Sequence, residues 1–234
     1  IASTNCILMV DATPVFVDID PENLNIDPAK IEEKITKKTK AILPVAIFGN
    51  PAGMDKVCQI AKKHNLPVIE DSCEALGSEL NGKKAGTFGT VGTFAFYPNK
   101  QMTTGEGGMI VTNDDGIADI CASLKNQGRG KGAGWLAHER MGYNFRMCDI
   151  NAALGIVQLG RLEEFIQKRQ HVAGMYQEML ADENRLIVPK ASANCKMSWF
   201  VFVVRLKGSL VSKRNDILKA MTAEGIQVSN YFPP

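Results

Sequence analysis

The sequence predicts an α/β protein in which a mostly parallel sheet is flanked by helices. Runs rich in β-branched and aromatic residues alternate with amphipathic stretches of helical period over residues 13–71. Glycine, proline and polar residues separate these stretches, as turns do. The hydrophobic fraction of 45% over 234 residues is ample for a sizeable core. Alternating strands and helices are typical of an open sheet whose strands run parallel.

The first part of the chain supplies this alternation element by element. The expected order is strand, helix, strand, helix and strand, over residues 13–20, 27–39, 40–48, 54–65 and 66–71. The first strand, TPVFVDID, ends in acids as a short buried strand does. Asp27 is suited to cap the first helix and Pro28 to occupy its first turn. The second helix ends in basic residues, which the helix dipole favours.

The second part of the chain adds two strands and then a smaller unit. The expected elements are strands at 91–98 and 107–113, helices at 115–126 and 149–180, a strand at 199–206 and a helix at 213–226. The glycine-rich segment 126–147 lacks periodicity and is predicted to be a long loop, of the kind that often carries function. We therefore predict a large domain over 1–180, incomplete at its N-terminus, with 149–180 as a linking helix. A partial small α+β domain is predicted over 181–234.

Composition excludes several classes of partner. Lys and Arg number 27 against 25 Asp and Glu, so no strong field attracts nucleic acid or an anionic membrane. The six cysteines are scattered and no pair has the spacing of a zinc or redox motif. No apolar run has the length of a bilayer span, and the first residues lack a basic leader. We expect a soluble cytoplasmic protein with reduced thiols and a small-molecule ligand.

Charged residues follow two of the predicted strands. VIEDSCEALG places Asp71 and Glu74 at the end of the strand at 66–71, and FYPNK places Lys100 just past the strand at 91–98. Ligands of open parallel sheets bind at these carboxyl ends. Taken separately, a strand-end carboxylate is usually a cap and a turn lysine is usually solvated. Their shared location favours a ligand site.

Lys100 and Asp71 together suit pyridoxal phosphate. A lysine becomes a nucleophile when its pKa falls or when its nitrogen enters an imine. This cofactor supplies the imine and needs a carboxylate beside its ring nitrogen. Asp71 would hold the ring and Lys100 the aldehyde, while the glycines of TTGEGG allow close approach of backbone. The rivals are weaker, because the sequence has neither a P-loop nor a dinucleotide fingerprint at a strand-to-helix turn.

Longer stretches carry a resemblance to a known family. They are ATPVFVDIDPENLNID, TKAILPVAIFGNPAGMD, HNLPVIEDSCEALGS, GKKAGTFGTVGTFAFYPNKQMTTGEGGMIVTND, GYNFRM and IVQLGRLEEFIQKR. In this order they resemble the DegT/DnrJ/EryC1/StrS family of pyridoxal-phosphate-dependent sugar aminotransferases, over residues 1–234. The resemblance implies the fold type I aminotransferase architecture, with a large cofactor-binding domain and the start of a small α+β domain.

The resemblance assigns roles to individual residues. Lys100 matches the lysine that forms the imine and moves a proton between cofactor and sugar, and Asp71 matches the aspartate that pairs with the pyridine nitrogen. Glu74 falls where many members carry Gln or His beside the ring, and a glutamate there resembles the perosamine synthase branch. Asn144, in GYNFRM, matches an asparagine that reaches the cofactor phosphate of the neighbouring subunit. One departure is Ala95, which stands where many members have a phosphate-binding serine.

The activity implied is transfer of an amino group, from glutamate, to a 3- or 4-keto nucleotide-linked sugar by a homodimer with shared active sites. Two alternatives remain. A sugar dehydratase of the same family carries histidine in place of the lysine, and Lys100 argues against it. A non-catalytic protein that keeps the fold for dimerisation or scaffolding is consistent with Ala95, and with a cofactor cradle that falls partly before Ile1.

The glycine-rich loop holds secondary candidates. Trp135 either lines the pocket for the sugar or nucleotide or packs in an interface. Arg129 and Arg146 either meet a diphosphate or are solvated. His138 and Glu139 lack metal-like spacing with the other histidines, so we predict surface positions for them and no metal site.

Overall fold

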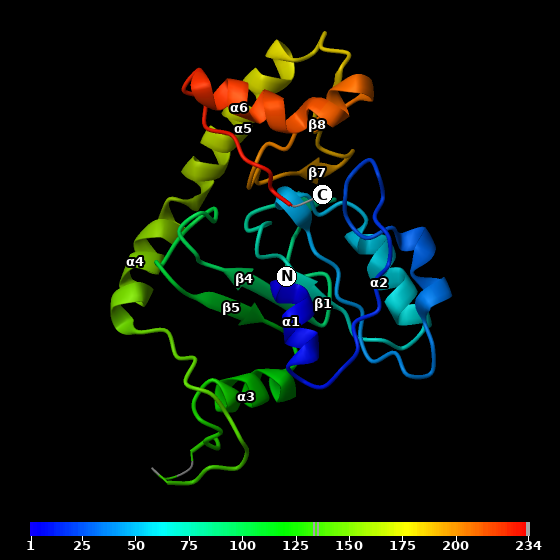
Figure 1. Ribbon diagram of the computed structural model, residues 1–234. Coiled ribbons are helices and arrows are strands. Elements are labelled where there is room, and N and C mark those ends of the chain that lie inside the picture. Colours follow the sequence, from blue (N-terminus) through cyan, green and yellow to red (C-terminus); the bar gives the residue numbers. More distant parts are fainter. Residues whose placement is uncertain (133, 135, 233–234) are drawn as a thin grey trace.

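The computed structural model describes residues 1–132, 134 and 136–232 (Figure 1). Its α-helices are α1 Ala2–Leu8, α2 Met54–Lys63, α3 Asp115–Leu124, α4 Asp149–Gly160, α5 Leu162–Met179 and α6 Arg214–Ala223. Its 3₁₀ helices are η1 Pro28–Lys30, η2 Glu32–Lys34, η3 Ile47–Gly49 and η4 Gly208–Lys213. Its strands are β1 Ile69–Asp71, β2 Glu79–Leu80, β3 Lys83–Lys84, β4 Val91–Ala95, β5 Gly108–Val111, β6 Leu186–Ile187, β7 Cys195–Lys196 and β8 Arg205–Leu206.

The central sheet has the order β1, β4, β5. β1 and β4 run parallel, with Asp71 opposite Thr93, whereas β4 and β5 run antiparallel. Isolated parallel bridges join Ile42 to Val68 and Val45 to Asp71, so the predicted strand at 40–48 contributes single bridges rather than a ladder. The sheet is therefore parallel on the β1 side, and β5 is an antiparallel addition to it.

Helices lie on both sides of this sheet. Figure 1 shows α4 beside one end of β4 and β5, α2 on the opposite side of the molecule, and α5 leading away toward α6 and β8. The main apolar cluster consists of Ile31, Ile42, Val57, Ala61 and Val68, all buried. Val57 and Ala61 are one turn apart on α2, so this helix presents an apolar stripe to the chain beside β1.

The later part of the chain returns to the first part. β7 pairs antiparallel with β2, with Lys196 opposite Glu79. Ser198, which is fully buried, follows β7 and donates its backbone N–H to Ser78 Oγ at 3.0 Å. Ser78 Oγ in turn donates to the carbonyl of Gly49 at 2.7 Å. These bonds anchor the segment after β7 beside η3.

The predicted strand at 13–20 is wrong. Phe16 is 72% exposed, and regular pairing is limited to an isolated bridge at Ile19. The Asp20 carboxylate accepts the N–H of Glu22 at 2.7 Å. A turn closed by a side chain thus competes with strand pairing here.

The predicted helix at 27–39 is reduced to η1 and η2. Asp27 caps it as expected, because its Oδ1 accepts the N–H of Ala29 at 2.9 Å. The helix does not continue, since the N–H of Thr36 is taken by Thr39 Oγ1 at 2.9 Å.

Two further expectations need correction, although α2, α3 and α6 lie where helices were predicted. The single helix at 149–180 is two helices that meet at Arg161, and the glycine before this residue, Gly160, is a weak helix former. The strand at 199–206 is confined to β8, because Trp199 has φ 50°, outside the strand region.

Membrane and redox features are simple. No helix in the described part of the chain combines the length and apolarity needed to cross a membrane. All six cysteines are free thiols, and of these Cys6 and Cys148 are exposed.

Candidate active site

The parallel strands β1 and β4 carry the predicted site residues to one edge of the sheet. β1 ends at Asp71 and β4 ends at Ala95. Lys100 follows in a turn, in which its N–H donates to the carbonyl of Tyr97 at 3.0 Å. The carboxyl ends of parallel strands are where open α/β sheets bind ligands. Asp71 and Lys100 thus follow the ends of two parallel strands, as expected from the sequence, and the ligand site itself stays a prediction.

Lys100 lies between a carboxylate and an aromatic ring. Its Nζ is 3.7 Å from Glu74 Oε1 and 4.3 Å from the centroid of the Phe200 ring. The side chains of Lys100 and Glu74 are only 15% and 12% exposed. Such limited exposure strengthens the attraction between the two charges relative to a solvated pair. The sequence did not indicate Phe200, which is 100 residues away along the chain.

Glu74 is held by groups from three parts of the chain. Its Oε2 accepts the N–H of Phe48 at 2.9 Å, and its Oε1 accepts the hydroxyl proton of Tyr231. Its backbone carbonyl accepts from the amide of Gln101. Phe48 has φ 58°, a backbone conformation that is costly for a bulky residue. This strained turn directs the Phe48 N–H at the carboxylate.

Tyr231 and Phe232 bring the end of the described chain onto the site. The Tyr231 ring meets Phe48 edge to face with centroids 5.1 Å apart, and it meets Phe200 at 6.0 Å. Burial raises the pKa of the Tyr231 phenol, and the neighbouring Glu74 carboxylate raises it further. Tyr231 is therefore a proton donor to Glu74 at neutral pH. Figure 1 shows this segment in red, returning from α6 toward η3.

Asp71 is a half-buried carboxylate at the end of β1, and both of its oxygens accept hydrogen bonds. Its Oδ2 accepts the Ser3 hydroxyl proton at 2.7 Å, and its Oδ1 accepts the N–H of Cys73 at 3.2 Å. Burial, and next to it the Asp71 charge, raises the pKa of the Cys73 thiol to about 12. Cys73 therefore stays a neutral thiol at physiological pH and is no competitor to Lys100 as a nucleophile. Ser3 belongs to α1, a helix that the sequence did not indicate.

The glycines after Lys100 are explained by the backbone conformation and packing of the turn that contains them. Gly105 has φ 79°, and a Cβ there would meet nothing within 4 Å. A Cβ at Gly107 would come within 2.5 Å of Thr104 Oγ1 and 2.7 Å of Met147 Cε. Close packing of the chain on itself thus explains Gly107 before any ligand is considered.

Among the contacts of the described residues, none joins Asn144 to Asp71, Glu74 or Lys100. Asn144 forms an antiparallel bridge with Asn126 and is exposed. Figure 1 shows that the loop around it projects past α3, away from the sheet edge. Arg146 bonds to the side chain of Asn126, and His138 Nδ1 lies 2.9 Å from the carbonyl of Gln127. Trp135 lies outside the described residues.

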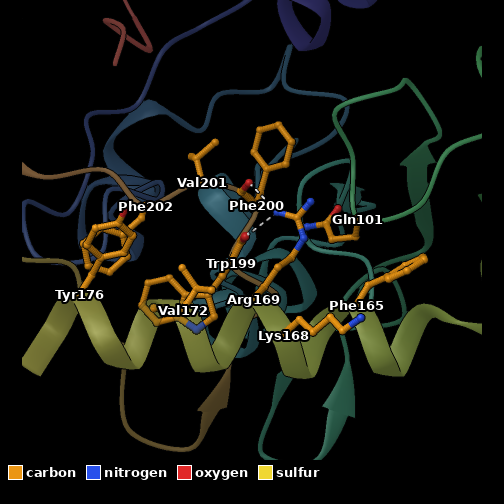
Figure 2. Close-up of a pocket in the computed structure, with 11 residues that line it drawn as sticks. Gln101, Phe165, Lys168, Arg169, Val172, Tyr176, Trp199, Phe200, Val201 and Phe202 are labelled. Atoms are coloured by element: carbon orange, nitrogen blue, oxygen red, sulfur yellow. Dashed lines mark hydrogen bonds between the residues drawn. The ribbon is translucent and has the colours of Figure 1, made fainter. Parts of the chain in front are cut away.

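A cavity of about 540 Å³ adjoins the wall of the site (Figure 2). It is lined by Gln101, Phe165, Lys168, Arg169, Val172, Ala173, Tyr176, Trp199, Phe200, Val201 and Phe202. Arg169 rises from α5, and its Nη1 donates to the carbonyls of Trp199 and Phe200, at 3.0 Å each. Burial lowers the pKa of Arg169, which nevertheless stays charged at neutral pH. These two hydrogen bonds from Arg169 fix the backbone that carries Phe200.

Comparison with known proteins decides the family. The sequence matches the DegT/DnrJ/EryC1/StrS aminotransferase family over residues 1–234. The chain belongs to this family. As a DegT/DnrJ/EryC1/StrS chain it is 41% identical over 235 residues to GDP-perosamine synthase of Caulobacter vibrioides, and the match covers 100% of this chain and 63% of the relative.

Solved structures agree with this assignment. PseC of Helicobacter pylori, an aminotransferase involved in the biosynthesis of pseudoaminic acid, superposes with a TM-score of 0.94 at 31% identity. This match covers 100% of the chain and 63% of PseC. The E. coli GDP-4-keto-6-deoxy-D-mannose-3-dehydratase with bound hydrated PLP gives a TM-score of 0.83 at 33% identity, covering 91% of the chain and 58% of that protein. The predicted α/β aminotransferase fold is confirmed, and the chain spans less than two thirds of the length of these proteins.

Proposed function

We propose that the protein uses pyridoxal phosphate to transfer an amino group to a keto carbon of a nucleotide-linked sugar. One observation carries the proposal: a shielded lysine, Lys100, lies 3.7 Å from the Glu74 carboxylate at the same sheet edge as Asp71. A lysine with a carboxylate on the neighbouring strand is the minimum that this cofactor needs. Membership of the aminotransferase family supports the same chemistry.

The residues present suit the cofactor at two of its groups. Lys100 Nζ would bond to the aldehyde carbon. Asp71 would hold the ring nitrogen through Oδ2, an oxygen that already accepts a hydroxyl proton. When bound, the cofactor supplies an electron sink for the carbon that loses or gains a proton. Ala95 contributes no hydroxyl at the phosphate, so that end depends on other groups, among which we propose Asn144 of a neighbouring subunit.

The chain's own groups then do the proton work. With its Nζ free, Lys100 would act as base and then as acid at the substrate carbon. Glu74 Oε1 keeps the resulting ammonium close to that carbon. Phe48 and Tyr231 hold the Glu74 carboxylate in place through their hydrogen bonds, and their rings shield it from water.

The relatives suggest the substrates. The resemblance to a GDP-perosamine synthase at 41% identity favours a GDP-linked sugar with a keto group at position 4, ahead of a 3-keto sugar on another nucleotide. Glutamate is the proposed amino donor. Incubation of the full-length protein with glutamate and a panel of 3- and 4-keto nucleotide sugars, followed by mass spectrometry, identifies the acceptor.

Exposed apolar side chains support a homodimer. Those on α4 and in the loop before it include Met141, Phe145, Ile150, Ile156, Val157 and Leu159, each more than half exposed. A monomer rarely exposes so many contiguous apolar groups. We propose that a second copy covers them and that Asn144, whose described contact is with Asn126, reaches the partner's cofactor.

Mixing of variants tests whether sites are shared. K100A and N144A are each expected to be inactive, whereas refolding them together restores about a quarter of the wild-type rate, because half of the dimers are mixed and each has one intact site. Activity that stays at background, with dimers still formed, would contradict shared sites.

Domain organisation and location complete the proposal. We propose that residues 1–180 are the cofactor-binding domain and 181–234 part of the small domain, with segment 198–200 returning to the site. A cytoplasmic location is proposed because all six cysteines are free thiols.

Chemical trapping tests the central claim. With pyridoxal phosphate added, the protein should absorb visible light, and borohydride should fix the cofactor on Lys100, as peptide mass spectrometry will show. K100R keeps the charge but forms no such bond, so it should stay colourless and lose at least about 1,000-fold in turnover. A colourless wild-type protein with unmodified Lys100 would favour the non-catalytic alternative.

Product analysis separates the enzyme alternatives. A dehydratase removes a hydroxyl group from the sugar, whereas an aminotransferase adds nitrogen. The solved dehydratase shares the fold, so fold alone does not choose between them. A product that carries ¹⁵N from labelled glutamate supports the aminotransferase, and a deoxygenated product without nitrogen overturns it.

A further inference from the structure

The position of Lys100 against Phe200 has no role in the chemistry described so far. Lys100 Nζ lies 4.3 Å from the centroid of the ring, within the range of a cation–π contact. The 3.7 Å to Glu74 Oε1 is too long for a hydrogen bond. Glu74 Oε1 is engaged by Tyr231, and Oε2 by the N–H of Phe48. The carboxylate therefore attracts the ammonium without bonding to it, and the ring is its second favourable contact.

Phe200 is fixed in this place from two sides. It is 4% exposed, and its N–H donates to the carbonyl of Phe48 at 3.2 Å. Its own carbonyl accepts from Arg169, which also binds the carbonyl of Trp199 (Figure 2). Because the backbone is held in this way and the buried ring also meets Tyr231 edge to face at 6.0 Å, the ring loses little freedom when the ammonium of Lys100 approaches it.

We propose that Phe200 is a positioning residue which, together with Glu74, holds the ammonium of Lys100 whenever this lysine is not bonded to the cofactor. The inference rests on the proposed function, in which Lys100 is released and takes up a proton in each half of the cycle. A free ammonium would otherwise be drawn toward water, because the lysine stem is flexible. The negative face of the ring attracts the ammonium and so keeps it near the site.

The test measures Lys100 in cofactor-free protein. Hydroxylamine removes the cofactor, and a trace of acetic anhydride then labels amines, which react as the neutral form, for quantification by peptide mass spectrometry. F200L should raise the labelling rate of Lys100 about three- to ten-fold, the range expected for loss of a partly desolvated cation–π contact. Trifluorophenylalanine at position 200 keeps the ring and its volume but withdraws electron density, and should raise the rate about three-fold. F200W should restore the wild-type rate.

Controls lie within the same chain. The Phe165 ring lines the same cavity but makes its cation–π contact with Arg161, whose guanidinium carbon lies 4.8 Å from the ring centroid. F165L should therefore leave the labelling of Lys100 unchanged. Lys83, which lies 4.8 Å from the Phe88 ring, reports general loosening if its labelling rises as well. Equal Lys100 labelling with phenylalanine and trifluorophenylalanine at position 200 overturns the inference. Borohydride trapping on Lys100 is a separate readout, so trapping that persists in that case leaves the proposed function intact.

Discussion

Lys100 owes its chemical character to side chains that lie far from it in the sequence. Glu74 follows β1 and lies before β2, Phe200 follows β7, and Tyr231 comes after α6. These neighbours shield the amine without burying it completely, since its side chain is 15% exposed. A lysine so placed is reachable by a cofactor aldehyde and is still held beside a carboxylate.

Asp71 gives a prediction at the same scale. D71N keeps the shape of the side chain but removes the charge that would hold the ring nitrogen protonated, so turnover should fall about 100-fold, as when one preorganised electrostatic partner is lost. Steady-state kinetics with glutamate and the accepted sugar measure the change. S3A removes the hydroxyl that donates to Asp71 at 2.7 Å while the carboxylate stays, so its loss should be less than about five-fold. Equal losses in both variants would mean that the charge of Asp71 is unimportant.

β1 shows how an element positions the site through a residue on its other face. Glu70 is fully buried, and its carboxylate accepts the N–H groups of Gly86 and Gly89. Burial raises the pKa of Glu70 above the ordinary 4.5, although the hydrogen bonds oppose this change. The carboxylate fastens the loop before β4 to β1, and so holds the two strand ends in register for Asp71 and Lys100.

The Glu70 anchor predicts a pH-dependent stability. For an acid whose pKa is raised on folding, the contribution to the free energy of unfolding is complete below pH 4.5 and is lost as pH rises through the raised value. E70Q leaves one buried N–H without an acceptor and should cost about 1–3 kcal/mol at pH 5. The wild type loses this contribution at higher pH and the variant does not. The difference in the free energy of unfolding between wild type and E70Q should therefore be smaller at pH 8 than at pH 5. Urea unfolding at both pH values checks this, and a difference that grows with pH contradicts it.

The other elements show where local pattern suffices. α2 and α3 lie where their periodicity placed them, and Asp27 caps η1 as its position before Pro28 predicted. The segment at 13–20 has the composition of a strand but lacks a paired ladder in the structure. A strand depends on partners elsewhere in the chain, whereas a helix closes its own hydrogen bonds, so helices are the more predictable elements.

At the scale of the whole molecule, the chain closes on itself around Glu74. β7 pairs with β2, Ser198 bonds beside η3, and the segment after α6 brings Tyr231 to the carboxylate. The proposed boundary at residue 180 is therefore crossed by contacts at the candidate active site. The position of the segment after α6 and the geometry of the Glu74 carboxylate are linked by the hydrogen bond from Tyr231.

Y231F tests this coupling. Phenylalanine keeps the ring contacts with Phe48 and Phe200 but loses the hydrogen bond to Glu74, so docking of segment 226–232 should weaken by about 1 kcal/mol, roughly five-fold. Hydrogen exchange of this segment measures the opening. The raised pKa of Tyr231 means that its contribution is complete below pH 10.0 and lost at higher pH, so the difference from wild type should be constant between pH 6 and 9. Y176F is the control, because the Tyr176 ring stacks on Phe202 and not on the residues around Glu74. This variant should leave the hydrogen exchange of segment 226–232 unchanged.

The sequence by itself placed Asp71, Glu74 and Lys100 after the ends of strands, because the pattern that predicts a strand lies in residues close together in the chain. The resemblance of successive segments to one family predicted the fold. The partners that determine how these residues act were decided by tertiary structure. Glu74 meets Tyr231 across 157 residues, and Lys100 meets Phe200 across a chain reversal through α5 and β7. Sequence periodicity does not predict such contacts. Each forms only when separate elements pack together and their buried polar groups must find hydrogen-bond partners.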